Sequence, residues 1–226
     1  MRSRVFAGIF LLALSIVGCS TGGEAGSQDP AHHSTSGSGK GDAEAPRRPP
    51  IALPAGVQRV VAVGDLHGDI TAARRVLRLA KLLGPGDTWT GGRTVLVQTG
   101  DLLDRGGTEL AMIRLFDRLR KEAAAAGGQV HLLLGNHEML NFRGEFRYVT
   151  KAGWREFAPF AKERAALALL TEKQRALIAA TPEKLQGRRI AFFPGGPISA
   201  YFAKSPVILK LGSVVFVHGG LRARHV

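Results

Sequence analysis

The chain has 226 residues, of which 45% are hydrophobic and 22% charged, a composition that suits one folded domain with appendages. Its single cysteine, Cys19, excludes an internal disulfide and a thiolate zinc cluster. The formal net charge of +13 favours acidic partners such as a phosphorylated substrate, while the lack of a basic stripe interleaved with aromatic residues argues against nucleic acid.

The N-terminal segment has the pattern of a secretory signal. Arg2 and Arg4 precede an apolar run, Val5–Val17, that is too short to span a membrane comfortably. The run leads into Gly18-Cys19 and resembles the bacterial lipobox, and this resemblance implies cleavage before Cys19 and lipid attachment to its sulfur. We therefore expect a lipoprotein signal peptide at residues 1–19, membrane contact through lipidated Cys19, and a location in the bacterial cell envelope, on the periplasmic side or at the outer membrane. An ordinary signal peptide is the alternative.

The remaining chain divides into a tether and a domain. Residues 20–56 are rich in Gly, Ser, Ala, Pro and Thr without an apolar period, which predicts a disordered tether. The domain is expected to occupy residues 57–226. Its apolar runs predict strands at 59–64, 94–99 and 129–134, and its apolar faces predict helices at 70–83 and 108–126. This alternation predicts an α/β fold with a parallel sheet and right-handed crossovers.

The pattern changes in the last third of the chain. From residue 141 to residue 187 the apolar spacing predicts a helical insertion beside the site, whose aromatic residues form its own core. Gly195-Gly196-Pro197 predicts a turn. Strands at 206–211 and 213–218 then predict a hairpin that returns to the sheet with His218 at its end.

Four short motifs follow four of these apolar runs. They are GDLHGD at 64–69, GDLLDRG at 100–106, GNHE at 135–138 and VHGG at 217–220. Open α/β sheets build their sites where strands give way to loops, so we expect the polar residues of these motifs to meet. Carboxylate, amide and imidazole groups together suit divalent ions such as Mn, Fe or Zn.

Five residues are candidate metal ligands. Asp65 and His67 are two residues apart, so both can bind one ion from a single loop. Asp101 is the candidate for a carboxylate that bridges two ions, while Asn136 and His218 offer an oxygen and a nitrogen to the second. Two ions about 3.5–4 Å apart can activate water and stabilise phosphoryl charge together. The sequence thus predicts two divalent metal ions.

Three further residues are candidates for the chemistry itself. Arg105 can clamp two phosphoryl oxygens with its guanidinium. His137 can protonate the leaving group as a general acid, and Asp104 can orient its imidazole. Asp69 is expected to be a helix N-cap, and Glu138 is compatible with a structural role or with support of the site.

The four motifs in this order resemble those of the calcineurin-like metallophosphoesterase superfamily. GNHE and GDLLDRG are similar to its phosphoprotein-phosphatase branch, and Phe193–Pro197 is similar to the bacterial Shewanella-like protein phosphatases within it. The resemblance spans about residues 58–222. It implies a metallophosphoesterase-type β-sandwich flanked by helices. It also implies one metal held by Asp65, His67 and Asp101, a second held by Asp101, Asn136 and His218, phosphate held by Arg105, and an acid pair of His137 and Asp104.

The chain departs from this family after the last motif. Members carry a further metal-binding histidine, and usually an arginine, on a loop well beyond it. Here Arg224 and His225 follow the motif directly and do not match those positions. We therefore expect a C-terminally truncated chain that lacks the last part of the fold.

The predicted function is a dinuclear-metal-dependent phosphomonoester hydrolase. The expected reaction is metal-activated water attack on Ser, Thr or Tyr phosphate of a protein, or on a small phosphoester. One alternative is a dinucleoside polyphosphate hydrolase, which shares three of the motifs, although the glutamate of GNHE favours the phosphoprotein branch. The other alternative is a truncated, non-catalytic phosphate-binding lipoprotein.

Overall fold

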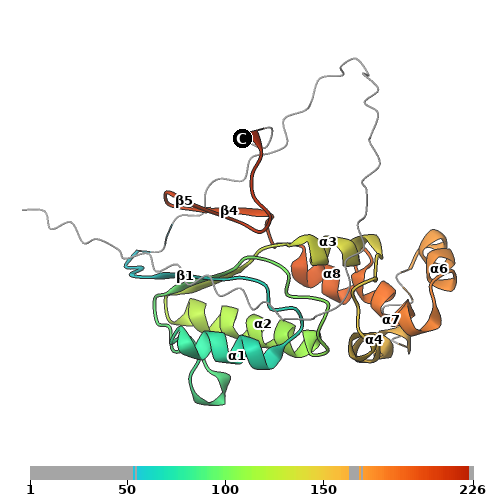
Figure 1. Cartoon of the computed structure of the whole chain (residues 1–226), viewed down its shortest axis with the longest axis horizontal. Coiled ribbons are helices and arrows are strands. Elements are labelled where there is room, and N and C mark those ends of the chain that lie inside the picture. Colours follow the sequence, from blue (N-terminus) through green and yellow to red (C-terminus); the bar gives the residue numbers. More distant parts are fainter. Residues whose placement is uncertain (1–52, 54, 163–167, 169, 224–226) are drawn as a thin grey trace, which may run out of the picture.

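The computed structural model describes residues 53, 55–162, 168 and 170–223 and shows a mixed α/β fold (Figure 1). Its strands are β1 (Val60–Val63), β2 (Val95–Gln98), β3 (Gln129–Leu132), β4 (Ile208–Leu211) and β5 (Val214–Val217). Its helices are α1 (Ile70–Leu79), α2 (Glu109–Ala125), α3 (Asn136–Arg143), α4 (Lys151–Phe157), α6 (Glu172–Ala179), α7 (Glu183–Phe192) and α8 (Pro197–Phe202), with 3-10 turns η1 (Pro85–Asp87) and η2 (Ala158–Lys162).

The first three strands form the predicted parallel sheet, in the order β1-β2-β3. Val61 pairs with Leu96 and Leu96 with Val130, so the strands end level with one another. All four residues of β2 are buried, as expected for a central strand covered on both faces. The loops that follow the three strands therefore start side by side at one edge of the sheet.

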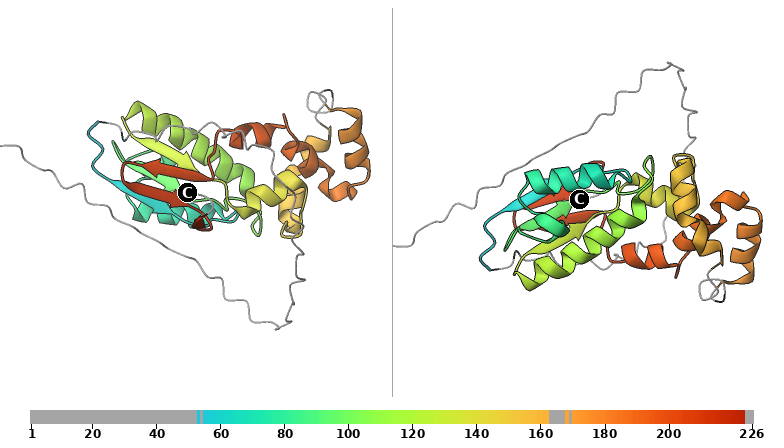
Figure 2. Two further views of the ribbon diagram at one scale, coloured as in Figure 1. Left: turned by 90° about the horizontal axis from the view of Figure 1, so that it is seen from above. Right: turned by 90° about the horizontal axis from the view of Figure 1, so that it is seen from below.

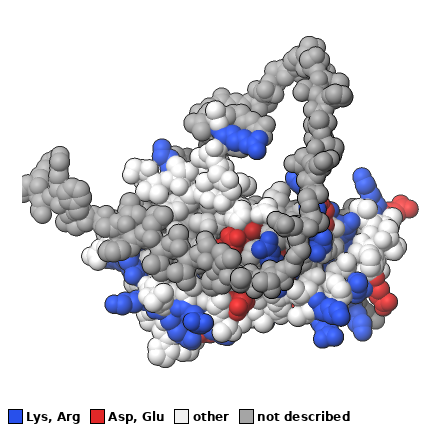
Figure 3. Space-filling model, viewed as in Figure 1, with Lys and Arg blue, Asp and Glu red and all other residues white. Residues whose placement is uncertain are grey.

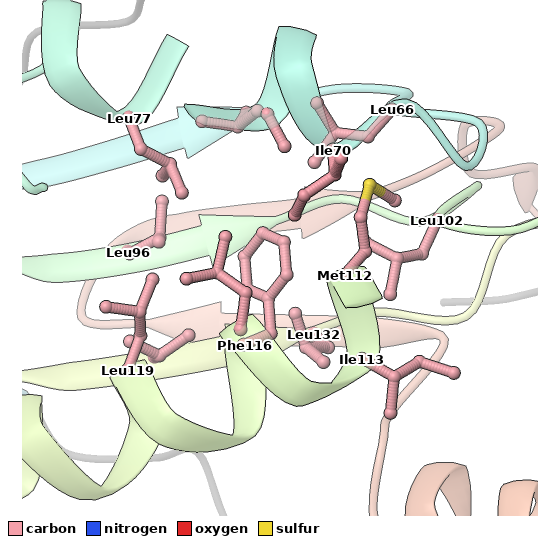
Figure 4. Packing of buried hydrophobic residues seen from close by; sticks show 14 of the residues in the cluster. Leu66, Ile70, Leu77, Leu96, Leu102, Met112, Ile113, Phe116, Leu119 and Leu132 are labelled. Carbon is pink, nitrogen blue, oxygen red and sulfur yellow. The ribbon is translucent and has the colours of Figure 1, made fainter. Parts of the chain in front are cut away.

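Helices α1 and α2 cover one face of this sheet. Leu77 of α1 and Met112, Phe116 and Leu119 of α2 are fully buried at helical spacing. Figure 4 shows them packed against the sheet around Leu96. This layer forms the larger of two apolar clusters and holds the strand ends in place.

Helix α1 begins and ends for identifiable reasons. The Asp69 carboxylate accepts two backbone N–H groups of the first turn, each at 2.9 Å, which confirms the predicted N-cap. The helix ends at Leu79 instead of the predicted residue 83. The reason is Lys81, whose φ of 56° is left-handed and turns the chain back toward the core.

The β4–β5 hairpin does not join the parallel sheet as predicted. It forms a separate antiparallel sheet on the face opposite α1 and α2, as Figure 1 shows. Alternation along the hairpin turns Leu209, Leu211 and Phe216 toward β2 and β3, while Ile208 and Val215 stay exposed on the other face. This gives the two sheet layers of a sandwich, with a second core made of Val95, Val97, Leu133, Leu209, Leu211 and Phe216.

The helical region is longer than the predicted 141–187. It starts inside the GNHE motif with α3 and continues through α7 and α8, and Figure 2 shows these helices gathered at one end of the molecule. Gly187 does not end a helix. It lies within α7, where a Cβ would overlap the carbonyl of Phe157 at the end of α4, so only glycine lets α7 pass this close to the junction of α4 and η2. The predicted turn at 195–197 leads directly into α8.

The predicted signal peptide at 1–19 and nearly all of the tether at 20–56 lie outside the described residues, as do Arg224 and His225. Envelope location and lipidation of Cys19 therefore stay predictions. Within the described ranges, no helix has both the length and the apolarity needed to cross a membrane.

Candidate metal centre and acid pair

The loops after β1 and β2 are tied together and strained. The backbone N–H groups of Leu66 and His67 both donate to the carbonyl of Asp101 at 3.0 Å. His67, Asp101, Asp104 and Arg105 have φ values between 45° and 66°, which non-glycine residues adopt only at an energetic cost. Strain concentrated in two touching loops points to a functional site.

Glu138 fastens these loops to the start of α3. Its fully buried carboxylate accepts the backbone N–H groups of Asp101, Leu102, Leu103 and Gly135 at 2.8–3.2 Å. Burial raises the pKa of Glu138, although these N–H donors act in the opposite direction. The role of Glu138, which the sequence left open, is therefore to hold in place the backbone of the two loops that carry the site.

We expect Glu138→Gln to destabilise the protein by about 2–4 kcal/mol, because a buried N–H left without an acceptor costs about 1–3 kcal/mol. Each oxygen of the carboxylate accepts two backbone N–H groups, and the NH2 group of glutamine would replace one oxygen, so two N–H groups would lose their acceptor. Chemical denaturation measures the loss. Glu145→Gln, at a half-exposed side chain, is the matched control and should change stability by less than about 0.5 kcal/mol. Equal stability of both variants would contradict this assignment.

The structure brings all five candidate metal ligands to one place. Asp101 lies at the centre, with Oδ2 3.3 Å from Nε2 of His218 and 3.8 Å from Nε2 of His67. The Asp65 carboxylate lies 3.6 Å from His67 and 3.8 Å from His218. Oδ1 of Asn136 lies 3.0 Å from Nε2 of His218. Residues from the other three motifs thus gather around the carboxylate of Asp101.

Among the described residues, two groups of three side chains have ligand atoms that all lie within 4.8 Å of one another. One group is Asp65, Asp101 and His218, and the other is His67, Asp101 and His137. Asp101 is shared by both, as expected of a bridging carboxylate. Both groups differ from the predicted ones: Asp65 is grouped with His218 instead of His67, and His137 lies beside His67 where Asp65 was expected. The assignment of His137 as an acid or as a ligand therefore needs its own test.

The donor atoms themselves fit cations. Nδ1 of His67 donates to the carbonyl of Leu103 at 2.9 Å, which leaves Nε2 buried without a hydrogen-bond partner in the described residues and facing two carboxylates. His218 likewise donates from Nδ1 to the carbonyl of Thr99 at 3.2 Å, so its Nε2 faces the oxygens of Asn136 and Asp101. Lone pairs converging in this way require a proton or a metal ion between them.

The charges within the cluster respond to one another. Burial acts to raise the pKa of Asp101, but hydrogen bonds from His218 and from the backbone of His137 outweigh it and lower that pKa. The hydrogen bond to Asp101 raises the pKa of His218, against the effect of burial. Asp101 therefore stays ionised, as a metal ligand must be.

A buried acid pair stands beside the ligands. Nδ1 of His137 donates to Oδ2 of Asp104 at 2.8 Å, and both side chains are buried. On the other side of the ring, Nη2 of Arg105 lies 3.3 Å from Nε2 of His137, and Asp101 lies 3.8 Å from it. A carboxylate-oriented imidazole beside a guanidinium can give a proton to a leaving group whose phosphate the guanidinium holds.

The GNHE glycine makes this approach possible. A Cβ at Gly135 would overlap the carboxylate of Asp101, so any larger residue would push the start of α3 away from the ligand. With glycine in place, the backbone N–H of His137 donates to Asp101 Oδ1 at 3.0 Å. The first turn of α3 thus helps to orient the central carboxylate.

The site opens onto the surface. A pocket of about 840 Å³ is lined by residues 64–72 and 105–108, which include Asp65, His67 and Arg105. Figure 3 shows acidic side chains near the middle of one face with Lys and Arg side chains beside them. The pocket reaches Asp65, His67 and Arg105, so an anionic substrate can approach this part of the site from solvent.

Sequence patterns missed four residues around the acid pair. The Tyr148 ring lies 4.9 Å from that of His137, with Arg105 5.7 Å from its centre. The other three, which lie behind Asp104, are Asn141, Glu109 and Arg188. Arg188 is 84 residues from Asp104 and sits in a charged helical stretch that looks like a solvated face, so no local signal singles it out.

A two-layer sheet sandwich with oxygen and imidazole ligands at strand ends, beside a His–Asp pair and an arginine, defines the class of metal-dependent phosphoester hydrolases. The chain belongs to the calcineurin-like phosphoesterase family, whose sequence model matches residues 58–225.

Two relatives of known name are Shewanella-like protein phosphatases. The chain is 39% identical over 187 residues to Shewanella-like protein phosphatase 2 of Arabidopsis thaliana, covering 75% of this chain and 48% of the relative. It is 32% identical over 164 residues to Shewanella-like protein phosphatase 1 of Plasmodium berghei, covering 72% of this chain and 39% of that one. A cold-active protein-tyrosine phosphatase of a psychrophilic Shewanella species is structurally similar, with a TM-score of 0.54 and 27% identity.

That structural match covers 73% of this chain and 43% of the Shewanella phosphatase. The chain therefore spans about half or less of the length of the proteins it resembles.

Proposed function

We propose that the chain carries the active site of a metal-dependent protein phosphatase that hydrolyses phosphomonoesters of Ser, Thr or Tyr. One observation carries the proposal: ligand atoms from all four motifs, Asp101 among them, lie together, and the buried His137–Asp104 pair and Arg105 lie beside them. The names of the relatives, protein phosphatases in each case, support a phosphoprotein as substrate.

The ligand residues would hold two divalent ions. Asp65, His67 and Asp101 would hold one, and Asp101, Asn136 and His218 the other. Bound divalent cations would supply a nucleophilic water near neutral pH and offset the charge on the phosphoryl oxygens. The buried Nε2 of His67 has no hydrogen-bond partner among the described residues, which supports its assignment as a metal ligand.

The remaining residues would act on the substrate directly. Arg105 would hold two phosphoryl oxygens with its planar guanidinium. Asp104 keeps the His137 ring in one orientation through the 2.8 Å bond to Nδ1, and Nε2 faces the guanidinium of Arg105 at 3.3 Å. In the protonated ring, Nε2 would carry the proton beside the phosphate that Arg105 would hold. His137 then gives that proton to the leaving oxygen of the serine, threonine or tyrosine side chain.

Phosphate release from phosphopeptides tests the proposal. Chelator-treated protein should be inactive on phosphoserine, phosphothreonine and phosphotyrosine peptides and should regain turnover with Mn²⁺. Diadenosine tetraphosphate serves as the competing substrate. Faster hydrolysis of the dinucleotide would favour the dinucleoside polyphosphate alternative, and the absence of turnover on every substrate with Mn²⁺, Fe²⁺ or Zn²⁺ would refute the proposal.

Calorimetric titration with Mn²⁺ tests the number of ions. Two tight sites per chain are expected, and they should disappear together when Asp101 is replaced. One tight site without turnover would support the alternative of a phosphate-binding protein.

A further inference from the structure

Arg188 of α7 is a fully buried arginine, the largest buried side chain of the described residues. Burying a guanidinium is costly unless charged and polar groups pair with it. Its polar partners are Asp104 of the acid pair and, behind that pair, Glu109 and Asn141, so this arginine links the helical region to the site.

The guanidinium is held on every side. Its two terminal nitrogens donate to both oxygens of Glu109, at 3.0 and 2.7 Å, in a bidentate pair. Its Nε donates to Oδ1 of Asn141 at 2.6 Å. The rings of Phe157 and Phe192 lie 4.5 and 5.2 Å from its central carbon. One well-defined position results.

From that position Arg188 also reaches the carboxylate of the acid pair. Its Nη2 donates to Oδ1 of Asp104 at 2.8 Å, and Asn141 donates to the same oxygen at 3.0 Å. The other oxygen, Oδ2, accepts from His137 at 2.8 Å. The two oxygens of Asp104 thus have separate partners, and the carboxylate cannot rotate without losing one of them.

We propose that Arg188 is a positioning residue for the His137–Asp104 pair: it fixes the plane of Asp104 and thereby the direction in which His137 delivers its proton. This inference rests on the proposed function of the pair. It gives the helical region a part in the chemistry, because α7 supplies the residue that orients a carboxylate on the loop after β2. A purely structural role, as partner of Glu109 alone, is the competing explanation.

Leaving-group dependence separates the two roles. In Arg188→Met, kcat for phenyl phosphate, whose leaving group needs a proton, should fall about 10-fold or more relative to kcat for 2,4-dinitrophenyl phosphate, a part of the 10²–10⁴-fold that a general acid supplies. KM should change little, because Arg188 touches no substrate. A structural role would lower both rates equally. Arg189→Met, one residue along α7, is the matched control and should keep the wild-type ratio.

A second variant, R188M/E109L, controls for a loss of folding in Arg188→Met. Arg188→Met leaves Glu109 buried without its partner, so the double variant R188M/E109L removes both charges, an exchange that is often neutral for stability. It leaves Asn141 as the remaining donor to Oδ1 of Asp104. The ratio of the two rates should shift as in the single variant, and a wild-type ratio in the folded double variant would overturn the proposal.

An activity-independent readout keeps this test separate from the proposed function. The hydrogen-bonded Nδ1 proton of His137 should give a low-field NMR signal in metal-free, ¹⁵N-histidine-labelled protein. In R188M/E109L this signal should move upfield or broaden, and in R189M it should stay. An unchanged signal in the double variant would overturn the positioning role even if the wild-type protein showed no phosphatase activity, an outcome that would refute the proposed function alone.

Discussion

Replacing Asp101 by asparagine is expected to lower Mn²⁺-dependent phosphatase activity by more than about 100-fold, since changing even the outer partners of metal ligands costs about 10–100-fold. Asp101 stands between His67 and His218 and belongs to both sets of ligand atoms. The neutral amide removes the charge that a bridging ligand contributes. It keeps an oxygen that can accept the backbone N–H of His137, so the fold should persist.

Calorimetry and turnover measured on the same preparation check this expectation. Asp101→Asn should lose tight Mn²⁺ binding along with activity, while its thermal unfolding stays close to that of the wild type in chelator. Asp117→Asn, a surface carboxylate on α2 paired with Lys121, is the matched control and should leave binding and turnover unchanged. An Asp101→Asn variant that retained more than a tenth of the activity would contradict the central place of this residue.

Replacing His137 by asparagine is expected to lower turnover by about 10²–10⁴-fold, the usual contribution of a general acid. The loss should be greatest for phenyl phosphate and small for 2,4-dinitrophenyl phosphate. The asparagine amide can still donate toward Asp104, so the contacts of Arg188 should survive. His131→Asn is the matched control, because His131 pairs with Gln129 on β3 away from the ligand cluster.

The same variant separates the two roles that geometry allows for His137. As a general acid it should be dispensable for Mn²⁺ binding, and calorimetry should find both sites in His137→Asn. As a ligand beside His67 and Asp101 it would be required for one of them. Loss of a Mn²⁺ site together with equal rate losses on both phosphate esters would identify His137 as a metal ligand instead of the general acid.

Much of the site could be predicted from the chain because its geometry is local. Each motif directly follows an apolar run, and parallel strands with crossovers bring their carboxyl ends to one edge. Asp65, Asp101 and Asn136 therefore had to approach one another once the strands paired in order. The placement of the β4–β5 hairpin was less accessible, since its strands are apolar at nearly every position and so do not show which face is buried or which layer it covers.

The sequence by itself determined the parallel sheet, the motifs at its edge and the residue types that gather there, because strand period and motif spacing are properties of short segments. Only the tertiary structure decided that His218 reaches Asp101 from a second sheet, that Glu138 holds four backbone N–H groups, and that Arg188 stands behind Asp104. Those contacts depend on how whole elements pack, such as α7 passing close to the end of α4 at Gly187, and packing over such separations leaves no periodic trace in the chain.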